Sequence, residues 1–192
     1  DTAWEEGWVK VNTPVNSVDK SVGIIGAGPG GLAAADRLRQ EGLEVTIYDR
    51  YDRAGGLLTY GIPGFKLEKD VVMRRNEQLE KSGIKFVLNT NVGVDITFDE
   101  IREKHDFVIL ATGVYKAREL DIPNGDLNGK VAALDYLTAS NRLSFGDRVE
   151  EFETGTFNAS GKKVVVIGGG DTAMDCVRTA VRQGATSVKC LY

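Results

Sequence analysis

Cysteine and histidine are scarce in this chain, which has two cysteines and one histidine among 192 residues. The cysteines, Cys176 and Cys190, lie near the C-terminal end and form no C-x-x-C pair. A disulfide framework, a zinc site and a redox-active cysteine pair earlier in the chain are therefore not expected. Both thiols are expected in or near the core, because free cysteine is among the most often buried residues.

Long apolar runs and an excess of basic charge are also missing. No run approaches the roughly 20 apolar residues that span a bilayer, and the first residues lack the basic-then-apolar order of a signal peptide. The net charge of -4, with lysine and arginine scattered among acids, argues against nucleic acid and membrane partners. The composition is that of an ordinary globular protein, for which a cytoplasmic location is expected.

A glycine-rich stretch, VGIIGAGPGGLAAADRL, joins the first predicted strand to the first predicted helix. Gly26, Gly28 and Gly31 form the pattern G-x-G-x-x-G, which supplies a tight turn, close approach to a pyrophosphate and close helix packing. Asp49 ends the next predicted strand, 44–49, where a carboxylate can bind an adenosine ribose. The alternative for the three glycines is a tight turn that binds no ligand. The alternative for Asp49 is a solvent-exposed acid in a turn. This β-α-β unit predicts an α/β fold with a parallel sheet.

The segment before the first unit, 1–20, is expected to be an extended lead-in that packs across a neighbouring surface. Several further helices and strands are predicted after the first unit. A capping-box pattern at Thr97 and Glu100 predicts a short helix. The other predicted elements are a helix at 68–81, a strand at 84–89, a buried strand at 107–113 and a helix at 133–142 within a looser crossover. His105, between a helix and a strand, is expected to have a surface or capping role, and no acid-base catalyst is assigned.

A second fingerprint begins at the buried-strand pattern KVVVIGGG, with Gly168, Gly170 and Ala173 forming G-x-G-x-x-A. Asp171 and Thr172 lie in the first helical turn, where Asp171 is expected to cap the helix. Alanine at the third position is common where the ligand is a nicotinamide dinucleotide. Only 29 residues run from Val164 to Tyr192. The sequence is therefore expected to contain only the start of a second, truncated dinucleotide-binding domain and to be inactive by itself.

The spacing of Gly26, Gly28 and Gly31, Asp49, the doublet Gly55-Gly56 and the turn Ala111-Thr112-Gly113 resembles the flavin-binding half of the two-dinucleotide-binding-domain flavoproteins. That resemblance implies a Rossmann-like FAD-binding domain followed by the start of an NAD(P)-binding Rossmann-like domain. The expected divisions are an N-terminal linker at 1–20, the first part of the FAD-binding domain at 21–115, a crossover at 116–161 and the start of the NADPH-binding domain at 162–192. The resemblance places Gly55 and Gly56 near the flavin diphosphate, and the alternative is that they are simple turn glycines.

Longer stretches, among them GGLLTYGIPGFKLEKDVV and VVVIGGGDTAMDCVRTAVRQGATSVKCLY, resemble the family of small (β) subunits of NADPH-dependent glutamate synthases. The resemblance implies hydride transfer from NADPH to FAD. It also implies electron transfer through 4Fe-4S clusters, expected in an N-terminal domain that this chain lacks, to the large (α) subunit, where glutamate forms. Ferredoxin:NADP reductase-type and dihydropyrimidine dehydrogenase-type modules share these motifs, and a non-catalytic nucleotide-binding module is the rival from another class.

The resemblance also implies which residues bind each nucleotide. The FAD residues would be Gly26, Ala27, Gly28, Pro29, Gly30, Gly31, Asp49, Arg50, Gly55, Gly56, Leu57, Lys66, Val92, Ala111, Thr112 and Gly113. The NADPH residues would be Gly168, Gly170, Asp171, Thr172 and Ala173. The family often has glutamate at the position of Asp49 and arginine at that of Lys66, and both changes keep the charge. For Lys66, a plain surface lysine is an equal alternative.

Overall fold

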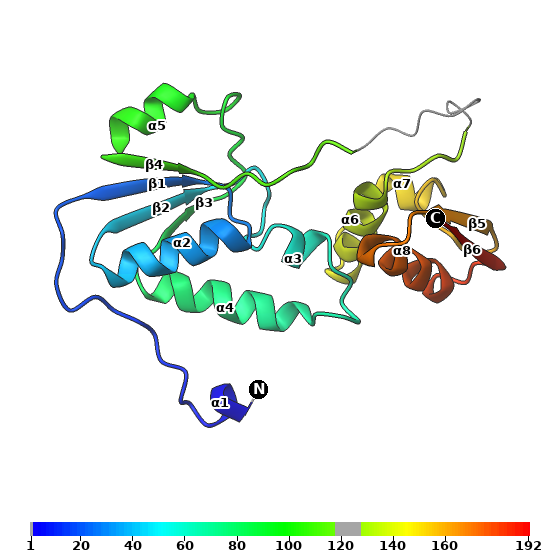
Figure 1. Ribbon diagram of the computed structural model, residues 1–192, viewed down its shortest axis with the longest axis horizontal. Coiled ribbons are helices and arrows are strands. Elements are labelled where there is room, and N and C mark those ends of the chain that lie inside the picture. Colours follow the sequence, from blue (N-terminus) through cyan, green and yellow to red (C-terminus); the bar gives the residue numbers. More distant parts are fainter. Residues whose placement is uncertain (1, 118–127) are drawn as a thin grey trace. The chain divides into compact units, whose positions relative to one another are not determined.

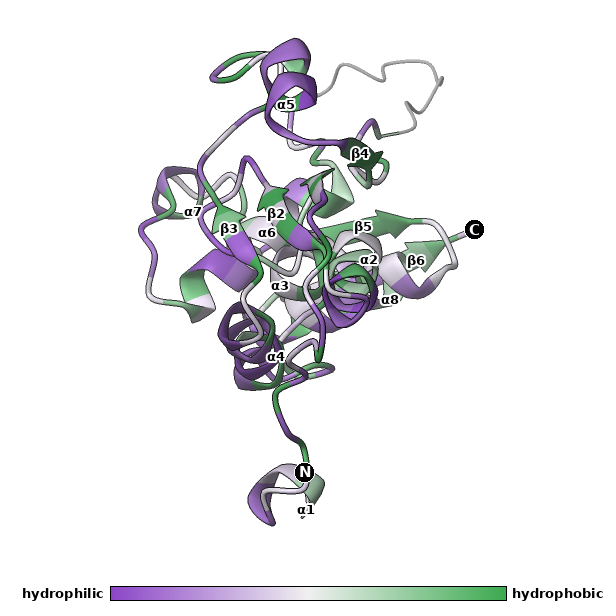
Figure 2. Cartoon of the chain, turned by 90° about the vertical axis from the view of Figure 1, so that its left-hand side faces the viewer, coloured by the Kyte–Doolittle hydropathy of each residue, from purple (hydrophilic) through white to green (hydrophobic). Residues whose placement is uncertain are grey.

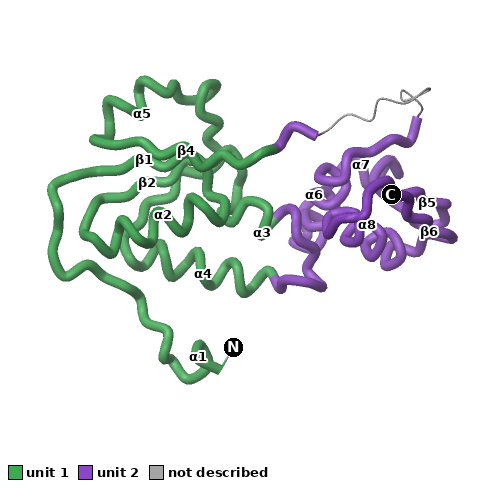
Figure 3. The backbone as a smooth tube through the Cα atoms, viewed as in Figure 1, with its two compact units in different colours: residues 1–59, 69–114 green, residues 60–68, 115–192 purple. Residues whose placement is uncertain are grey.

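The computed structural model of the protein describes residues 2–117 and 128–192, which divide into two compact units (Figure 3). Unit 1 comprises residues 1–59 and 69–114, and unit 2 comprises residues 60–68 and 115–192. The segment 60–68 therefore belongs to unit 2, although the chain on both of its sides belongs to unit 1. The predicted crossover includes residues 118–127, which lie outside the described residues.

Unit 1 is built on a four-stranded parallel sheet (Figure 1). Its strands, in the spatial order β3-β2-β1-β4, are β1 (Ser21–Ile25), β2 (Glu44–Tyr48), β3 (Lys85–Val87) and β4 (Phe107–Leu110). In β1, Val22 lies opposite Val45 of β2 on one side and Phe107 of β4 on the other. This is the order of the first four strands of a Rossmann fold, which confirms the predicted α/β class.

Helices cover both faces of this sheet. The helices of unit 1 are α1 (Thr2–Glu5), α2 (Pro29–Gln40), α3 (Leu57–Tyr60, whose last residue falls in unit 2), α4 (Lys69–Lys81) and α5 (Phe98–Lys104). Because side chains alternate along a strand, Ile24 packs in a core with Leu32 of α2 and Leu79 of α4. Its neighbour Ile25 packs on the opposite face with Ile101 of α5. Burial on both faces is typical of a parallel strand that helices cover on both sides.

The helix predicted from the capping-box pattern begins where it was expected. The Thr97 hydroxyl accepts a hydrogen bond from the Glu100 amide at 3.2 Å, and the Glu100 carboxylate accepts one from the Thr97 amide at 2.8 Å. Hydrogen bonds from the backbone and hydroxyl of Thr97 lower the pKa of Glu100. The reciprocal pair satisfies two amide groups at the N-terminus of α5, which have no partner within the helix.

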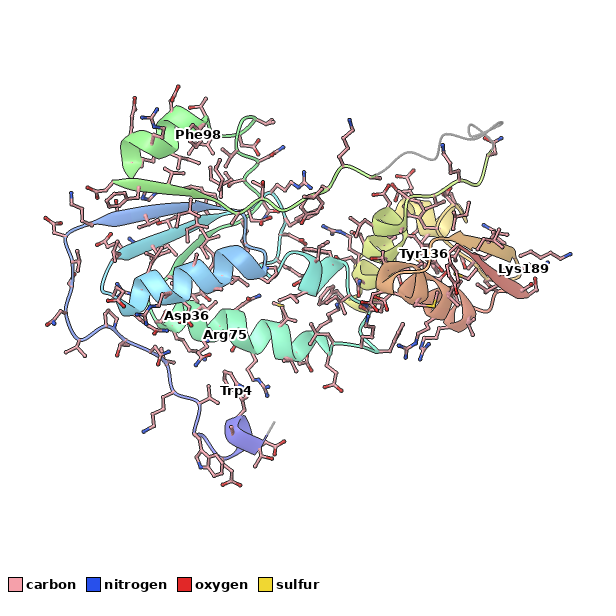
Figure 4. All side chains as sticks on the ribbon, in the orientation of Figure 1. Trp4, Asp36, Arg75, Phe98, Tyr136 and Lys189 are labelled. Carbon is pink, nitrogen blue, oxygen red and sulfur yellow. The ribbon has the colours of Figure 1, made fainter. Side chains whose placement is uncertain are left out.

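The N-terminal lead-in lies along α4, as Figure 4 shows for Trp4. The guanidinium carbon of Arg74 is 4.4 Å from the Trp4 ring centroid, and the Gln78 side-chain amide donates to the Lys10 carbonyl at 2.7 Å. These contacts confirm that the lead-in packs on a neighbouring surface. Its start is a short helix rather than extended chain.

Unit 2 contains a second β-α-β arrangement. Strands β5 (Lys163–Ile167) and β6 (Ser187–Leu191) pair in parallel and are joined by α8 (Asp171–Arg182). Helix α6 (Ala133–Ser144) packs beside α8, where the Tyr136 hydroxyl donates to the Gln183 side chain at 2.8 Å. The short helix α7 (Glu150–Glu153) lies within the stretch predicted as crossover.

Two strands predicted to be buried are more exposed. The strand predicted over 107–113 ends at Leu110 and forms an edge of the sheet, with Phe107 and Leu110 57% and 67% exposed. In β5, Val165 and Ile167 are 56% and 58% exposed, and Figure 2 shows both strands of this small sheet as hydrophobic. Among the described residues these strands have neighbours on one side only, which periodicity in the sequence does not reveal. None of the described helices is long and apolar enough to cross a membrane.

Candidate functional site

The first glycine-rich loop lies at the carboxyl end of β1. Gly26 has a φ of +112°, and a Cβ there would lie 2.4 Å from the Ala111 carbonyl oxygen. A Cβ on Gly31 would lie 1.9 Å from the Gly26 carbonyl oxygen. The first and third glycines are therefore required by the fold itself, for the turn and for the packing of α2 against β1.

The second glycine of the loop is different, because no atom would contact a Cβ at Gly28 within 4 Å. Its φ of -74° is ordinary, and it is the N-cap of α2 without a side-chain cap. A Cβ at Gly30 would also meet open space. The loop thus presents bare backbone at a helix N-terminus, where the helix dipole favours an anion. This geometry fits a pyrophosphate.

Residues predicted for the first site come together from four separate segments of unit 1. The Gly55 amide donates to the Ala27 carbonyl at 2.8 Å, and a Cβ on Gly56 would lie 2.8 Å from the Gly28 Cα. The A-T-G turn joins them through the contact of Ala111 with Gly26. Gly55 and Gly56 have φ values of +117° and +53°. The doublet is thus a turn that glycine adopts readily and other residues do not, and it packs directly on the first loop.

Asp49 connects the loop to the end of β2. One carboxylate oxygen accepts a hydrogen bond from the Ala27 amide at 2.6 Å, and the other accepts one from the Tyr51 amide at 2.9 Å. Each carboxylate oxygen can accept a second hydrogen bond, so the side chain retains capacity for a ribose hydroxyl. The structure thereby gives Asp49 a role in holding the loop, in addition to the predicted contact with a ligand.

The remaining residues predicted for the first site have varied surroundings. Pro29 begins α2. Thr112 and Gly113 follow β4, and Gly113 has a φ of +70°. Val92 packs beside Ile25 and Tyr48.

Two more of the predicted residues are Arg50, which follows β2, and Leu57 of α3. Leu57 is the first residue of α3 and is 37% exposed. The Arg50 guanidinium contacts the Tyr51 ring and hydroxyl.

Lys66 belongs to a different compact unit from the first loop. It lies in unit 2, where its ammonium group is 3.0 Å and 3.1 Å from the two carboxylate oxygens of Asp175 on α8. The Asp175 side chain is 8% exposed and that of Lys66 is 35% exposed. Asp175 belongs to no recognised motif, and the two residues are 109 positions apart. The sequence therefore does not predict this ion pair.

Thr59 and Asn76 also support the first site without any signal in the sequence. The Thr59 hydroxyl and the Asn76 amide both donate to the Ala54 carbonyl, at 2.8 Å and 3.0 Å. Both side chains are buried. They hold the residue that immediately precedes the glycine doublet, and so they fix the start of this turn.

The second loop reproduces the backbone of the first. Gly168 has a φ of +132°, compared with +112° for Gly26. Gly170 is the N-cap of α8 with φ -84° and ψ 178°, close to the -74° and 177° of Gly28. A Cβ at Gly170 would also meet open space within 4 Å. The second loop therefore offers a pyrophosphate the same bare backbone.

The third position shows how the loops differ. A Cβ built on Gly168 would lie 3.6 Å from the Ala173 Cβ, an ordinary van der Waals contact. A side chain at the corresponding Gly31 would collide with the loop. The second loop therefore leaves room for a Cβ at the third position, whereas the first loop does not.

The prediction that Asp171 caps α8 is wrong. Gly170 occupies the N-cap position, no side chain caps the helix there, and Asp171 is the first helical residue. The reason is that the extended conformation of an N-cap falls on the second glycine of the fingerprint. Asp171 and Thr172 are exposed in the first turn. A carboxylate in this turn interacts favourably with the helix dipole.

His105 lies at the C-terminal end of α5, where the sequence predicts a surface or capping role. It is the C-cap residue of α5, and its Nε2 is 3.0 Å from the Tyr48 hydroxyl. Burial lowers its pKa. The hollow of about 290 Å³ beside it lies near the amino end of β4, whereas ligands of such sheets bind at the carboxyl ends. Among the described residues no cluster of three or more potential ligands could hold a metal ion.

The cysteines differ in accessibility, which predicts a labelling experiment. Cys176 is buried, which raises the pKa of its thiol to about 11, whereas Cys190 is partly exposed. Because the thiolate is the reactive form, we expect iodoacetamide at pH 8 to modify Cys190 in the folded protein and Cys176 only after denaturation. Peptide mass spectrometry measures both sites. The Cys190→Ser variant should take up no label while folded, and prompt labelling of Cys176 would contradict the structure.

A parallel sheet with a glycine-rich loop at the carboxyl end of its first strand, followed by a second strand-loop-helix unit of the same geometry, defines a protein with two dinucleotide-binding units. The chain belongs to the pyridine nucleotide-disulphide oxidoreductase family, whose model matches residues 20–192. Although the family name refers to disulfides, Cys176 and Cys190 of this chain are both free thiols and form no redox disulfide.

Several curated relatives match the chain over its whole length. It is 70% identical to a putative glutamate synthase [NADPH] small chain of Cereibacter sphaeroides and 63% identical to the glutamate synthase [NADPH] small chain of Azospirillum brasilense. Both matches cover 100% of this chain, but 46% and 40% of those proteins. The chain therefore spans less than half the length of these relatives.

A solved structure has the same fold. FprA of Mycobacterium tuberculosis in complex with NADPH matches with a TM-score of 0.71 and 25% identity, over 89% of this chain and 42% of that one. The family description names a pyridine nucleotide, and this structural relative was solved with NADPH bound.

Proposed function

We propose that this chain carries the FAD-binding loop and the beginning of the NADPH-binding unit of a glutamate synthase small subunit. The observation that supports this proposal most directly is the repeated loop geometry, in which Gly28 and Gly170 have matching backbone angles and equal open space. Two such loops in one chain serve two dinucleotides, and the full-length relatives carry the names of an NADPH-dependent enzyme.

The protein's contribution to the reaction is binding and orientation. The first loop, the doublet and Asp49 would hold FAD, and the second loop with Thr172 and Ala173 would hold the NADPH pyrophosphate. The bound nucleotides supply hydride transfer chemistry. No described side chain needs to move a proton. The electrons are then proposed to pass singly through 4Fe-4S clusters to the large subunit, where glutamate forms.

Absorbance spectroscopy tests the proposal. The full-length protein should show a flavin spectrum that NADPH bleaches under anaerobic conditions, and the reduced protein should transfer electrons to the large subunit. A colourless protein would instead support a nucleotide-binding module without turnover. Bleaching without transfer to the large subunit would favour a reductase that serves another acceptor.

Replacement of Asp49 tests the first site in particular. Asp49→Ala should weaken FAD binding by about 1.5 to 3 kcal/mol, the usual scale for hydrogen bonds to a charged group, or about 10- to 150-fold in Kd. The Ala27 and Tyr51 amides lose their acceptor in the same variant. Fluorescence titration of the flavin-free protein measures the affinity. Asp99→Ala, which removes an exposed carboxylate on α5, is the control, and equal Kd values in both variants would refute the assignment.

A further inference from the structure

Two arginines of α8 converge on one aromatic ring within unit 2. The guanidinium carbons of Arg178 and Arg182 lie 4.4 Å and 3.9 Å from the ring centroid of Phe65. All three residues belong to unit 2, so the arrangement is internal to that unit. Residues four apart on a helix share a face, and the two like charges repel each other. The attraction of each cation to the ring offsets that repulsion. The ring thus holds two guanidinium groups close together, here called the arginine pair.

Phe65 is itself fixed by its surroundings. The Pro63 carbonyl accepts hydrogen bonds from the Lys66 and Leu67 amides at 2.9 Å and 3.1 Å, which closes a turn around the aromatic residue. The side chain that follows it, Lys66, pairs with Asp175 of α8. Backbone hydrogen bonds and an ion pair therefore both set the position of the ring. Because the guanidinium groups rest on a fixed ring, they lose less conformational entropy when they bind a ligand.

Among the described residues, the arginine pair has no carboxylate partner. Asp175 lies three residues before Arg178 on the same face of α8, but its carboxylate binds Lys66. Arg182 donates one hydrogen bond, to the carbonyl of Arg178 at 3.3 Å. No other hydrogen bond or ion pair within residues 2–117 and 128–192 reaches either guanidinium group. Both side chains are exposed, so their remaining N–H donors are available to a ligand.

Two neighbouring guanidinium groups fit an oxyanion. Each can bind a carboxylate or phosphate through two parallel hydrogen bonds, and an anion shared by both also relieves their repulsion. The arginine pair lies on an exposed helix face, whereas small ligands bind in concave pockets that bury most of their surface. Arginine and aromatic residues are, by contrast, enriched where proteins meet. The chemistry that fits is therefore a carboxylate carried by another polypeptide.

We propose that the arginine pair is a docking site for an acidic segment of another protein, with Phe65 holding both guanidinium groups in place. The site is separate from the second loop, because at about 1.5 Å per residue Arg178 and Arg182 lie about 10 Å and about 16 Å along α8 from its first residue. It does not depend on which nucleotide that loop binds. The 192 residues carry a net charge of -4, so the attraction for an acidic partner comes from this local pair and not from overall charge.

Binding of a fluorescein-labelled hexaglutamate peptide to the full-length protein tests the proposal, with fluorescence anisotropy at low ionic strength as the measurement. In Arg178→Ala/Arg182→Ala we expect the Kd to rise about 10-fold, the combined scale of two exposed ion pairs. Phe65→Leu keeps both charges but lacks the ring, and its Kd should rise about 3-fold. Added salt should weaken binding because exposed charges are screened. NADP+ should not displace the peptide.

Arg148→Ala/Lys189→Ala is the matched control, because it also removes two exposed positive charges from unit 2. It should bind the peptide as the wild type does. Arg178→Lys/Arg182→Lys keeps the charges without the planar fork and should lose about 3-fold in affinity, which provides a second test should the alanine variant not fold.

Three outcomes would overturn the proposal. The first is an absence of binding by the folded wild-type protein, and the second is equal weakening in the matched control. The third is displacement of the peptide by inorganic phosphate at equal concentration, which would assign the arginine pair to a small free oxyanion. None of these outcomes involves the flavin or its reduction, so the proposed function is tested separately.

Discussion

Substitution of Gly28 by valine is expected to yield full-length protein without flavin, whereas the same substitution at Gly170 should leave the flavin bound and abolish its reduction by NADPH. Both glycines have ordinary φ values, and both would present a side chain to open space. Valine therefore fits the fold at either position. The space that it fills is where a pyrophosphate approaches the backbone.

The two variants control one another. Each places a β-branched residue at a helix N-cap, so each should lose a similar free energy of unfolding, about 1 kcal/mol. Gly26 and Gly168 are less useful targets because their φ values of +112° and +132° make any side chain strained. Flavin content, the rate of bleaching by NADPH and reduction by dithionite separate the outcomes. Equal loss of flavin in both variants would show that the two loops do not serve different nucleotides.

The architecture of unit 1 could be predicted from sequence because its signals are local. Strand and helix periods, the three glycines of the first fingerprint and the capping box at Thr97 each constrain a few neighbouring residues. The structure contains each of these elements. The glycines were also placed correctly in the loop, since the first and third are sterically required.

Features that depend on distant partners were not predictable in this way. The exposure of β4 follows from its place at the edge of the sheet, which the apolar pattern of 107–110 does not contain. The expectation that Asp171 would cap α8 failed because a glycine can occupy the N-cap as well. The assignment of residues 60–68 to unit 2 depends on ring and ion contacts with residues more than 75 positions away.

The ion pair of Lys66 with Asp175 predicts a large and asymmetric effect on stability. Lys66→Met would leave the buried Asp175 carboxylate without this cation. Because the lysine is 35% exposed, we expect a cost of about 3 kcal/mol, the lower end of the range for buried pairs. Asp175→Asn would leave an ammonium group whose side chain is 35% exposed and can reach water. We expect that variant to lose about 1 kcal/mol, the scale of a single hydrogen bond.

Urea unfolding of the flavin-free, full-length protein, together with hydrogen exchange of the α8 amides, measures this asymmetry in the absence of any ligand. The double variant Lys66→Met/Asp175→Leu removes both charges, and it should recover most of the stability lost in Lys66→Met because apolar replacement of a buried pair is often neutral. Flavin affinity is then compared between Lys66→Met, which lacks the ammonium group, and Asp175→Asn, which keeps it. The difference separates a contact between Lys66 and FAD from the loss of the ion pair. If Lys66→Met costs less than about 1 kcal/mol, the scale of an exposed ion pair, the pair contributes little to unit 2, and the lysine is available to the flavin as the family resemblance implies.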